Sequence, residues 1–183
     1  MQRDDLLLTA VRATILAGLA TLEVYESELH VDYKEDRSPL TLADTRSHEI
    51  IAGHLKHTGV PVLSEEGKTI PAAERRRWQR LWVVDPLDGT KEFIKHLGEF
   101  TINIALVENE RPTLGAIFVP VRNVLYFGRL EDGSYRLDDG QTLADLARAD
   151  AAGDARGAIE QLKARSTRLP LDLGAHTPFV IVG

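Results

Sequence analysis

Apolar residues recur at helical spacing near the start of the chain. The recurrence every three or four residues, with polar residues between, predicts one amphipathic helix over about residues 3–29. A second helical pattern opens at Thr41-Leu42-Ala43-Asp44 and ends at Thr58-Gly59. Between the two, residues 31–40 are charged and include Ser38-Pro39, which is typical of a loop or hairpin. The apolar positions are Leu6, Leu7, Val11, Ile15, Leu19 and Leu22 in the first helix and Ile50, Ile51 and Leu55 in the second.

Strand-length apolar runs dominate residues 60–137. The connections between the later runs are short and hold turn residues, which favours an antiparallel meander. A polar stretch over residues 68–80, with helical character around residues 72–79, separates the first two runs. The predicted strands are Val60–Leu63, Leu81–Val84, Phe100–Val107, Thr113–Val119, Val124–Phe127 and Ser134–Leu137, and the turns are Asn109-Glu110, Pro120–Asn123 and Glu131–Gly133.

These elements predict an α+β fold in which N-terminal helices pack on a mostly antiparallel sheet. We assign residues 1–140 to an N-terminal subdomain, and residues 141–183 to a surface helix and the first strand of a second subdomain. Together the two would form a layered α/β sandwich if complete. The last residues, Pro178–Gly183, have the pattern of a fully apolar strand, whereas chain ends are more often polar. We therefore expect the sequence to be a piece of a longer protein.

Composition narrows the functional classes. The chain has 183 residues, is 43% hydrophobic and carries a formal net charge of -6, which fits a globular protein and argues against a nucleic-acid polymer as partner. Because it has no cysteine, disulfides and thiolate metal sites are excluded. The segment MQRDDLLLTA makes a poor signal peptide, and we expect no apolar run of membrane-spanning length. The prediction is a cytoplasmic protein.

Two aspartates flank the point where one predicted strand ends. Residues 82–93 read WVVDPLDGTKEF, so the apolar run stops at Asp85. Pro86 lacks an N–H group and breaks the ladder, and the resulting turn swings Asp88 back toward Asp85. The two carboxylates and the freed carbonyl of Leu87 are hard oxygen ligands that suit Mg²⁺.

Gly89 and Thr90 complete this motif. Gly89 allows close backbone approach, and Thr90 begins a short helix whose free N–H groups would face a phosphate. A strand followed by a Pro-Asp turn and a helix cap, with no ligand, explains the same residues. The D-x-D-G-T motif of haloacid-dehalogenase phosphatases does not match these residues. Two residues, Pro86 and Leu87, separate the aspartates in this chain, whereas one residue separates them in that motif.

Two further segments supply acidic residues. Glu65 and Glu66 follow a short strand, and because adjacent extended residues point to opposite sides, one should bind metal while the other is solvated or structural. Asp44 lies in the first turn of the second helix. A solvated acidic turn and a favourable helix N-terminus are the ordinary explanations of these residues. Taken together, Asp44, Glu65, Asp85 and Asp88 predict a carboxylate cluster.

Three histidines, His48, His54 and His57, lie on the second predicted helix. The spacing of His54 and His57 would let them share a metal ion. No third ligand is evident beside them, so a solvated helix face is the simpler interpretation.

Three motifs in order carry a family resemblance. D-P-L-D-G-T after an apolar strand, E-E-G about twenty residues before it, and T-x-A-D earlier still resemble the Mg²⁺-dependent inositol monophosphatase superfamily. The motifs cover about residues 38–107. The wording W-V-V-D-P-L-D-G-T-K-E-F-I, with S-P-L-T-L-A-D upstream, is most similar to the bacterial 3′(2′),5′-bisphosphate nucleotidase (CysQ) group.

The resemblance implies a reaction and its rivals. It implies removal of the 3′-phosphate of adenosine 3′,5′-bisphosphate, a by-product of sulfate assimilation, to give AMP. Hydrolysis of an inositol phosphate or of a sugar bisphosphate is the alternative within the superfamily. The enzyme would be a monomer or homodimer that acts on a small phosphorylated molecule.

Carried over by position, the resemblance also implies two or more Mg²⁺ ions and the residues that serve them. Glu65 and the Leu87 carbonyl would bind the first ion, Asp85 would bridge two ions, and Asp88 would join the second. Asp44 and Thr90, with Glu65 beside them, would orient a metal-bound water for attack on phosphorus. The residues implied to line the substrate are Glu65, Leu87, Asp88, Gly89 and Thr90.

Part of the family's site has no counterpart in the sequence. The second half of the family carries a W-D-x-A segment whose aspartate completes the second metal site, and this chain holds no such segment. We therefore expect residues 1–183 alone to be weakly active or inactive. A metal-binding domain without turnover is the non-enzymatic alternative.

Overall fold

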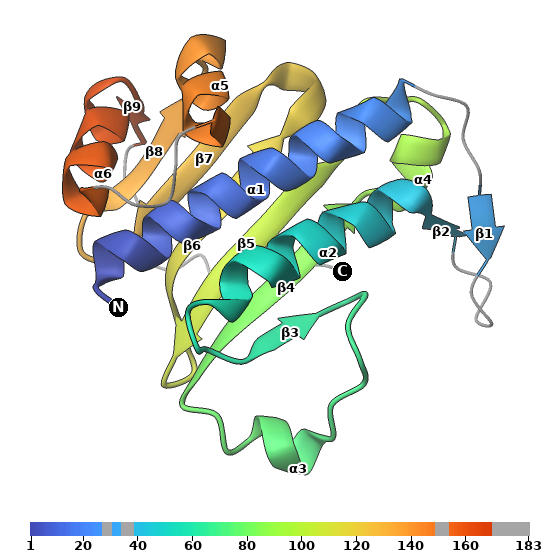
Figure 1. Ribbon diagram of the computed structural model, residues 1–183, viewed down its shortest axis with the longest axis horizontal. Coiled ribbons are helices and arrows are strands. Elements are labelled where there is room, and N and C mark those ends of the chain that lie inside the picture. The colour runs from blue at the N-terminus through green and yellow to red at the C-terminus, as the bar shows by residue number, and fades with distance from the viewer. Residues whose placement is uncertain (27–30, 34–38, 149–153, 170–183) are drawn as a thin grey trace, which may run out of the picture.

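The structure, a computed structural model, describes residues 1–26, 31–33, 39–148 and 154–169, and one mixed sheet forms its centre (Figure 1). In spatial order its strands are β3 (Val62–Ser64), β4 (Arg80–Asp88), β5 (Thr101–Glu108), β6 (Arg111–Val119), β7 (Val124–Arg129), β8 (Gly133–Leu137) and β9 (Thr167–Arg168). β3 runs parallel to β4, and each later pair of neighbours is antiparallel. The predicted meander is therefore confirmed from β5 to β8.

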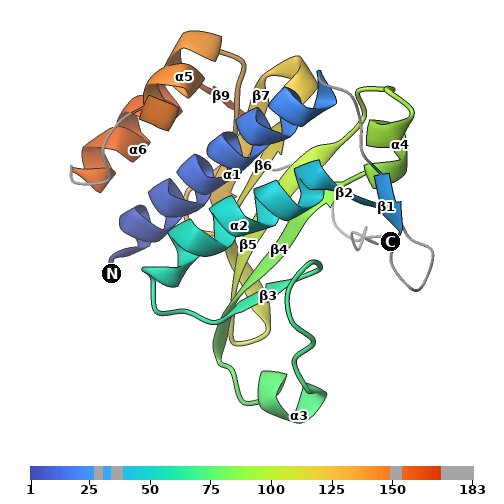
Figure 2. The same ribbon diagram turned by 45° about the vertical axis from the view of Figure 1, so that its right-hand side comes forward.

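Two long helices lie side by side across one face of this sheet (Figures 1 and 2). They are α1 (Arg3–Tyr25) and α2 (Leu42–Lys56), and α5 (Gly140–Arg148) and α6 (Ala155–Ala164) contact α1. The shorter elements are α3 (Ala72–Arg75), α4 (Thr90–Ile94), the 3₁₀ turn η1 (Pro120–Arg122) and an antiparallel pair formed by β1 (Val31–Tyr33) and β2 (Pro39–Thr41). The predicted α+β class, with N-terminal helices on a mostly antiparallel sheet, is confirmed.

α1 is buried on most of its circumference. It contacts α2, α5 and α6 as well as β5, β6 and β7, so even Arg12 is only 9% exposed. The expectation of an amphipathic helix is wrong in this respect, because neighbours cover nearly every side. Its predicted length is also too great, since α1 stops at Tyr25. Its last turn has no basic residue and contains Glu23, which is unfavourable at the negative end of a helix.

By length and composition alone, α1 is long and apolar enough to cross a membrane, which the sequence pattern did not lead us to expect. In the structure, 61% of its most apolar window is buried against the rest of the chain. A core helix of a folded domain has this composition too, because it must also be apolar on most sides.

An aromatic cluster joins the end of α1 to the segment that precedes β5. The ring of Tyr25 lies 5.1 Å from that of Phe93 in α4 and 5.2 Å from that of Phe100. Phe93 and Phe100 meet edge to face at 5.0 Å, and both are buried. Aromatic pairs at these distances pack favourably. They hold α4, and with it the Gly89-Thr90 segment, against the core.

The region after residue 140 differs from the expected single surface helix. It forms both α5 and α6, and β9 pairs with β8 at the edge of the sheet. Asp154 caps α6, because its side chain accepts a hydrogen bond from the Gly157 N–H. The division of the chain at residue 140 stays a prediction. The expected strand Pro178–Gly183 lies outside the described residues.

Two helical glycines give a test of the α1–sheet contact. A Cβ at Gly18 would lie 2.3 Å from Cδ1 of Phe118 in β6, whereas nothing lies within 4 Å of a Cβ at Gly53 in α2. We expect Gly53→Ala to stabilise the fold by about 0.5–1 kcal/mol, because alanine is the better helix former. We expect Gly18→Ala to destabilise it by about 1–3 kcal/mol, since overpacking outweighs that gain. Urea denaturation of both variants measures this, and equal effects would contradict the described packing.

Candidate active site

β4 carries the first two candidate carboxylates across an irregularity in its pairing. Asp85 pairs with Asn103 of β5, and Asp88 pairs with Thr101, so three steps along β4 match two along β5. The strand therefore does not end at Asp85, as the sequence suggested, but bulges at Pro86 and resumes. In a regular strand, residues three apart point to opposite faces, and one extra residue reverses this. The bulge thus brings Asp85 and Asp88 to the same side.

A side-chain contact supports this common orientation. Asn103, which lies opposite Asp85, places its Nδ2 atom 3.4 Å from Oδ2 of Asp88. The amide of Leu87, at the bulge, donates to Oδ1 of Asp85 at 3.3 Å. The predicted approach of Asp88 to Asp85 is thus produced by a bulge within the strand instead of by a turn after it.

Glu65 enters the same region from the parallel neighbour of β4. Ser64, the last residue of β3, pairs with Val84, and the Glu65 N–H donates to the Val84 carbonyl at 3.2 Å. Glu65 therefore follows β3 at the level where Asp85 follows Val84. Glu65 is exposed and Glu66 is half-buried, so the two glutamates differ in environment as expected from their adjacent positions.

The electrostatic effect of this arrangement falls on Asp85. Burial, followed by the charges of Glu65 and Asp88 and a smaller contribution from Glu66, raises the pKa of Asp85 to about 6. The hydrogen bond from the Leu87 amide acts in the opposite direction but is weaker. Several carboxylates thus repel one another at the end of β3 and the bulge of β4. A cation bound there would relieve that repulsion.

Asp44 and Thr90 meet on the helix side of the bulge. Asp44 is 5% exposed in the first turn of α2, and its Oδ2 lies 3.5 Å from the Thr90 hydroxyl. The same hydroxyl donates to the Leu87 carbonyl at 3.1 Å. The structure therefore brings Asp44, Thr90 and the bulge together, although they come from three separate elements.

Gly89 connects the bulge to α4 in a conformation that only glycine adopts readily. Its φ is 92°, and an added Cβ would lie 2.7 Å from the Glu99 carbonyl oxygen. As predicted, a short helix then begins at Thr90, with Gly89 as its N-cap. The turn after β4 is therefore compact because it packs against the backbone that leads into β5.

The donor set fits a hard divalent cation in kind. The carboxylates of Glu65, Asp85 and Asp88 and the Leu87 carbonyl are oxygen donors of the type that Mg²⁺ binds. Within the described parts of the chain, no three acidic or histidine side chains stand close enough together to hold a metal ion as they are placed. The exposed Glu65 and Asp88 side chains would have to turn toward Asp85 to do so. His57 is exposed as expected for a solvated helix face, but His54 is half-buried, and burial followed by the charge of Arg12 lowers its pKa.

Two contacts were missed by sequence reasoning. Ser47, fully buried on α2, donates to the Pro86 carbonyl at 2.5 Å, and His48 Nδ1 lies 2.9 Å from the Ser64 hydroxyl. His48 is therefore not simply part of a solvated face. The spacing of Ser47 and His48 from Asp44, three and four residues, is the signal that would have placed all three on one side of α2.

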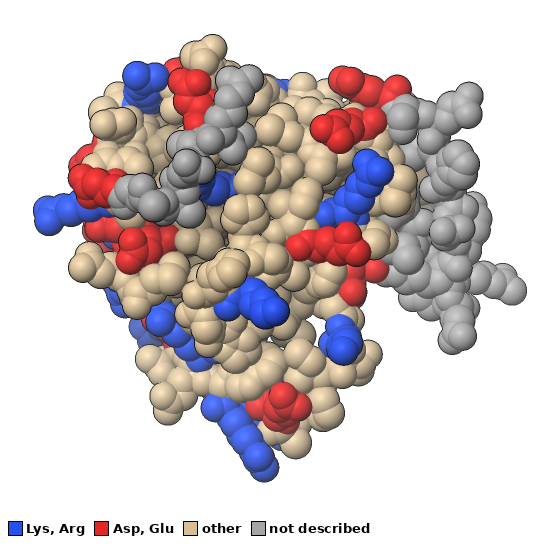
Figure 3. Space-filling view, viewed as in Figure 1, with Lys and Arg blue, Asp and Glu red and all other residues tan. Residues whose placement is uncertain are grey.

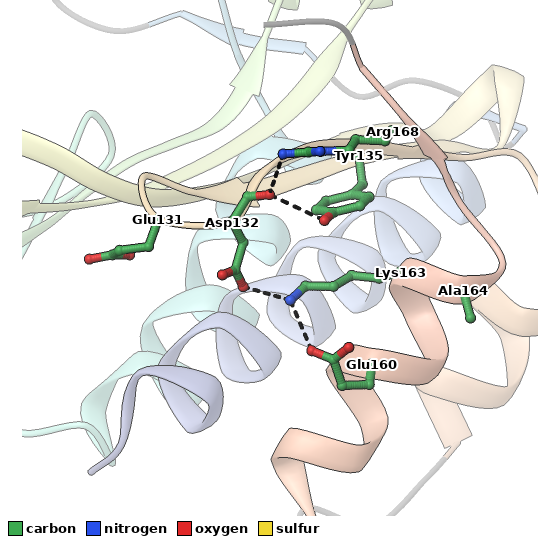
Figure 4. A pocket seen from close by; sticks show the side chains of 7 residues that line it. All are labelled: Glu131, Asp132, Tyr135, Glu160, Lys163, Ala164 and Arg168. Atoms are coloured by element: carbon green, nitrogen blue, oxygen red, sulfur yellow. Dashed lines mark hydrogen bonds and ion pairs between the residues drawn. The ribbon is translucent and has the colours of Figure 1, made fainter.

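Two cavities among the described residues lie elsewhere. One, of about 540 Å³, lies between the β8–β9 edge and α6, where Lys163 Nζ lies 2.6 Å from Asp132 and 3.0 Å from Glu160 (Figure 4). The other, of about 360 Å³, lies between α1 and α5 and is mostly apolar. Three charged groups in the first, Lys163, Asp132 and Glu160, are already paired with one another. The carboxylate cluster lies outside both cavities.

Comparison with known proteins defines the class to which this arrangement belongs. The model of the inositol monophosphatase family matches residues 2–167, so the chain belongs to the inositol monophosphatase family. Among curated proteins, it is 50% identical over 116 residues to the 3′(2′),5′-bisphosphate nucleotidase CysQ of Salmonella typhimurium. That match covers 61% of this chain and 46% of the relative. The chain thus spans about half the length of the curated relatives it matches.

Comparison with solved structures supports the same family. The chain is similar to CysQ from Bacteroides thetaiotaomicron, a bacterial member of the inositol monophosphatase family, with a TM-score of 0.77 and 43% identity over 93% of this chain and 59% of that chain. It also shares its fold with an IMPase/NADP phosphatase complexed with Mg²⁺ and phosphate, with a TM-score of 0.57 and 20% identity. The second match covers 65% of this chain and 45% of that chain.

The raised pKa of Asp85 gives a metal-free test of the cluster. The ordinary pKa of this carboxyl group is 3.8. As the pH rises from about 4 to about 6, Asp85 ionises in the unfolded chain before it ionises in the folded one, so the free energy of unfolding falls. Above about pH 6 the loss is complete. We expect Asp85→Asn to raise the free energy of unfolding at pH 7.5 by on the order of 1–2 kcal/mol, a value reduced for solvent screening. The gain should shrink toward zero at pH 4.

Urea denaturation in the presence of a chelator measures this difference at both pH values. Asp145→Asn, at an exposed carboxylate on α5, is the control and should show no such rise between pH 4 and pH 7.5. A lower free energy of unfolding for Asp85→Asn than for the parent at pH 7.5 would show that burial and the neighbouring charges do not destabilise the Asp85 carboxylate.

Proposed function

We propose that this chain carries the metal- and phosphate-binding part of a Mg²⁺-dependent phosphomonoesterase. The substrate that we favour is adenosine 3′,5′-bisphosphate, whose 3′-phosphate would be removed to give AMP. The observation that carries the proposal is the convergence of Glu65, Asp85 and Asp88 on one strand end, with Asp44 and Thr90 beside it. The 50% identity to proteins named 3′(2′),5′-bisphosphate nucleotidase supports the choice of substrate.

The proposed roles follow from where each residue lies. Glu65, Asp85, Asp88 and the Leu87 carbonyl would hold two or more Mg²⁺ ions. Bound there, Mg²⁺ would neutralise the phosphate and strengthen a water molecule as nucleophile. The compact Leu87–Thr90 backbone would lie along the phosphate, since Gly89 presents no side chain to block it.

Asp44 and Thr90 would act on the attacking water. The Thr90 hydroxyl would orient the water, and the buried Asp44 carboxylate, 3.5 Å away, would accept its proton as the water oxygen bonds to phosphorus. The bond from phosphorus to the 3′ oxygen then breaks with its electron pair on that oxygen, which takes up a proton from solvent water as it leaves. Water would attack directly, without a covalent intermediate on the protein.

Charge supports a small substrate. On the face seen in Figure 3, acidic and basic side chains are interspersed, and the part of the chain drawn there forms no continuous basic surface. The formal net charge is -6. A nucleic-acid polymer needs a basic surface for its phosphates, whereas a single phosphate ester needs only local neutralisation. We place the protein in the cytoplasm, as a monomer or homodimer.

A substrate panel tests the proposed specificity. We expect phosphate release from adenosine 3′,5′-bisphosphate to exceed that from inositol 1-phosphate and fructose 1,6-bisphosphate, and to stop when Mg²⁺ is chelated. The panel is run on residues 1–183 and on any longer protein in which the reading frame continues. Faster release from inositol 1-phosphate would favour the inositol monophosphatase alternative, and no release from any ester would favour a metal-binding domain without turnover.

One substitution tests the proposed metal ligands. We expect Asp88→Asn to lower Mg²⁺-dependent phosphate release by about 100-fold or more, because it removes a proposed metal ligand while keeping the shape of the side chain. Asp88 is exposed, so circular dichroism and the unfolding midpoint should stay close to those of the parent. Asp145→Asn serves again as the control. Full activity in Asp88→Asn would refute the carboxylate assignment.

A further inference from the structure

One face of α2 contacts three segments that carry candidate site residues. Asp44 contacts Thr90 at the start of α4, at 3.5 Å. One turn later, Ser47 donates to the Pro86 carbonyl at 2.5 Å, and its neighbour His48 contacts the Ser64 hydroxyl at 2.9 Å. The spacings of three and four residues bring these side chains to one side of the helix.

Ser47 fixes the bulge of β4. The Pro86 carbonyl belongs to one of the two residues between Asp85 and Asp88 that have no partner in the register with β5. Ser47 is fully buried, and a buried carbonyl without a donor is costly. The hydroxyl therefore satisfies a backbone group that the bulge takes out of the ladder, and ties it to α2.

His48 fixes the other acidic segment. Ser64 is 9% exposed and directly precedes Glu65. Because Glu65 in turn donates its N–H to the Val84 carbonyl, the end of β3 is held on two sides, by α2 and by β4. The spacing of the Glu65 and Asp85 segments is thus set by the β3–β4 pairing and, on the helix side, by two adjacent side chains of α2.

This matters because the segments repel one another. Like charges brought together in a partly buried place push their backbones apart unless something holds them. When the backbone segments are already held at a fixed spacing, only the side chains have to turn toward a cation, so less entropy is lost on binding than if the segments also had to be brought together. Residues that orient metal ligands from behind commonly change metal affinity by 10- to 100-fold when they are removed.

We propose that Ser47 and His48 are positioning residues that set the spacing of the Glu65 and Asp85 segments and thereby the affinity of the site for Mg²⁺. Neither side chain touches the reacting atoms. The inference rests on the proposed function, because it assumes that these segments bind Mg²⁺. It goes beyond that function by assigning a role to two residues outside the ligand set.

The test measures Mg²⁺ binding without substrate, by calorimetry and by the rise of the unfolding midpoint with Mg²⁺ concentration. The variants are Ser47→Ala, His48→Ala and His48→Asn, whose amide offers a polar atom where Nδ1 was. Thr14→Ala is the matched control, because Thr14 is a buried hydroxyl that donates to the Ala10 carbonyl within α1, away from the acidic segments.

We expect Ser47→Ala and His48→Ala to weaken Mg²⁺ binding by about tenfold or more. His48→Asn should restore most of the affinity, and Thr14→Ala should lower stability while leaving Mg²⁺ affinity unchanged. Amide exchange of Leu87 in the absence of Mg²⁺ should quicken in Ser47→Ala but not in Thr14→Ala. A purely structural role predicts instead that all four variants lose stability and that none changes Mg²⁺ affinity beyond twofold, which would overturn the inference.

The outcomes separate this inference from the function on which it rests. If the parent chain binds Mg²⁺ but no ester is hydrolysed either by it or by a longer protein that contains it, the proposed function fails and the variants still decide the positioning role. If the parent binds and hydrolyses but the variants bind Mg²⁺ as tightly as Thr14→Ala, only the positioning role is overturned. If the parent does not bind Mg²⁺ at all, both are wrong.

Discussion

The bulge in β4 is the constraint on which the candidate site depends. Without the extra residue at Pro86, Asp85 and Asp88 would point to opposite faces of the sheet, and only one of them would reach the end of β3. The bulge has a cost, because it removes backbone groups from the ladder. Ser47 offsets that cost by donating to the Pro86 carbonyl. The positions of the carboxylates therefore depend on how α2 packs against β4.

Electrostatic strain and packing oppose each other at this place. The pKa of Asp85 is raised to about 6 by burial and by its acidic neighbours, which indicates that the metal-free fold keeps these groups close against their repulsion. Core packing holds these groups in place: α2 packs on β4, and the rings of Tyr25, Phe93 and Phe100 pack behind α4. The favourable packing of the core thus offsets the repulsion between these carboxylates.

Sequence reasoning found most of the elements and the acidic residues, and it failed where tertiary contacts decide. Alternation and turn residues located β5 to β8, because each strand is half-buried in a meander with short connections. Nothing local shows that α1 is covered on most sides, or that β4 continues through a proline, since both depend on neighbours. His48 looked solvated because its partner, Ser64, is sixteen residues away in sequence. The bulge was taken for a turn, since both place a proline between two aspartates.

The acidic residues and the side chains that hydrogen-bond to their segments all come from residues 44–103, a continuous stretch that ends within β5. Closing loops of this size costs slightly less entropy than pairings that span a whole domain, by about 0.6 kcal/mol for each doubling of loop length. The strands that complete the meander, β6 to β9, contribute packing but none of these side chains. During synthesis on the ribosome, the contacts among Asp44, Ser64, Asp85 and Asn103 therefore have all their partners before the second half of the sheet has emerged.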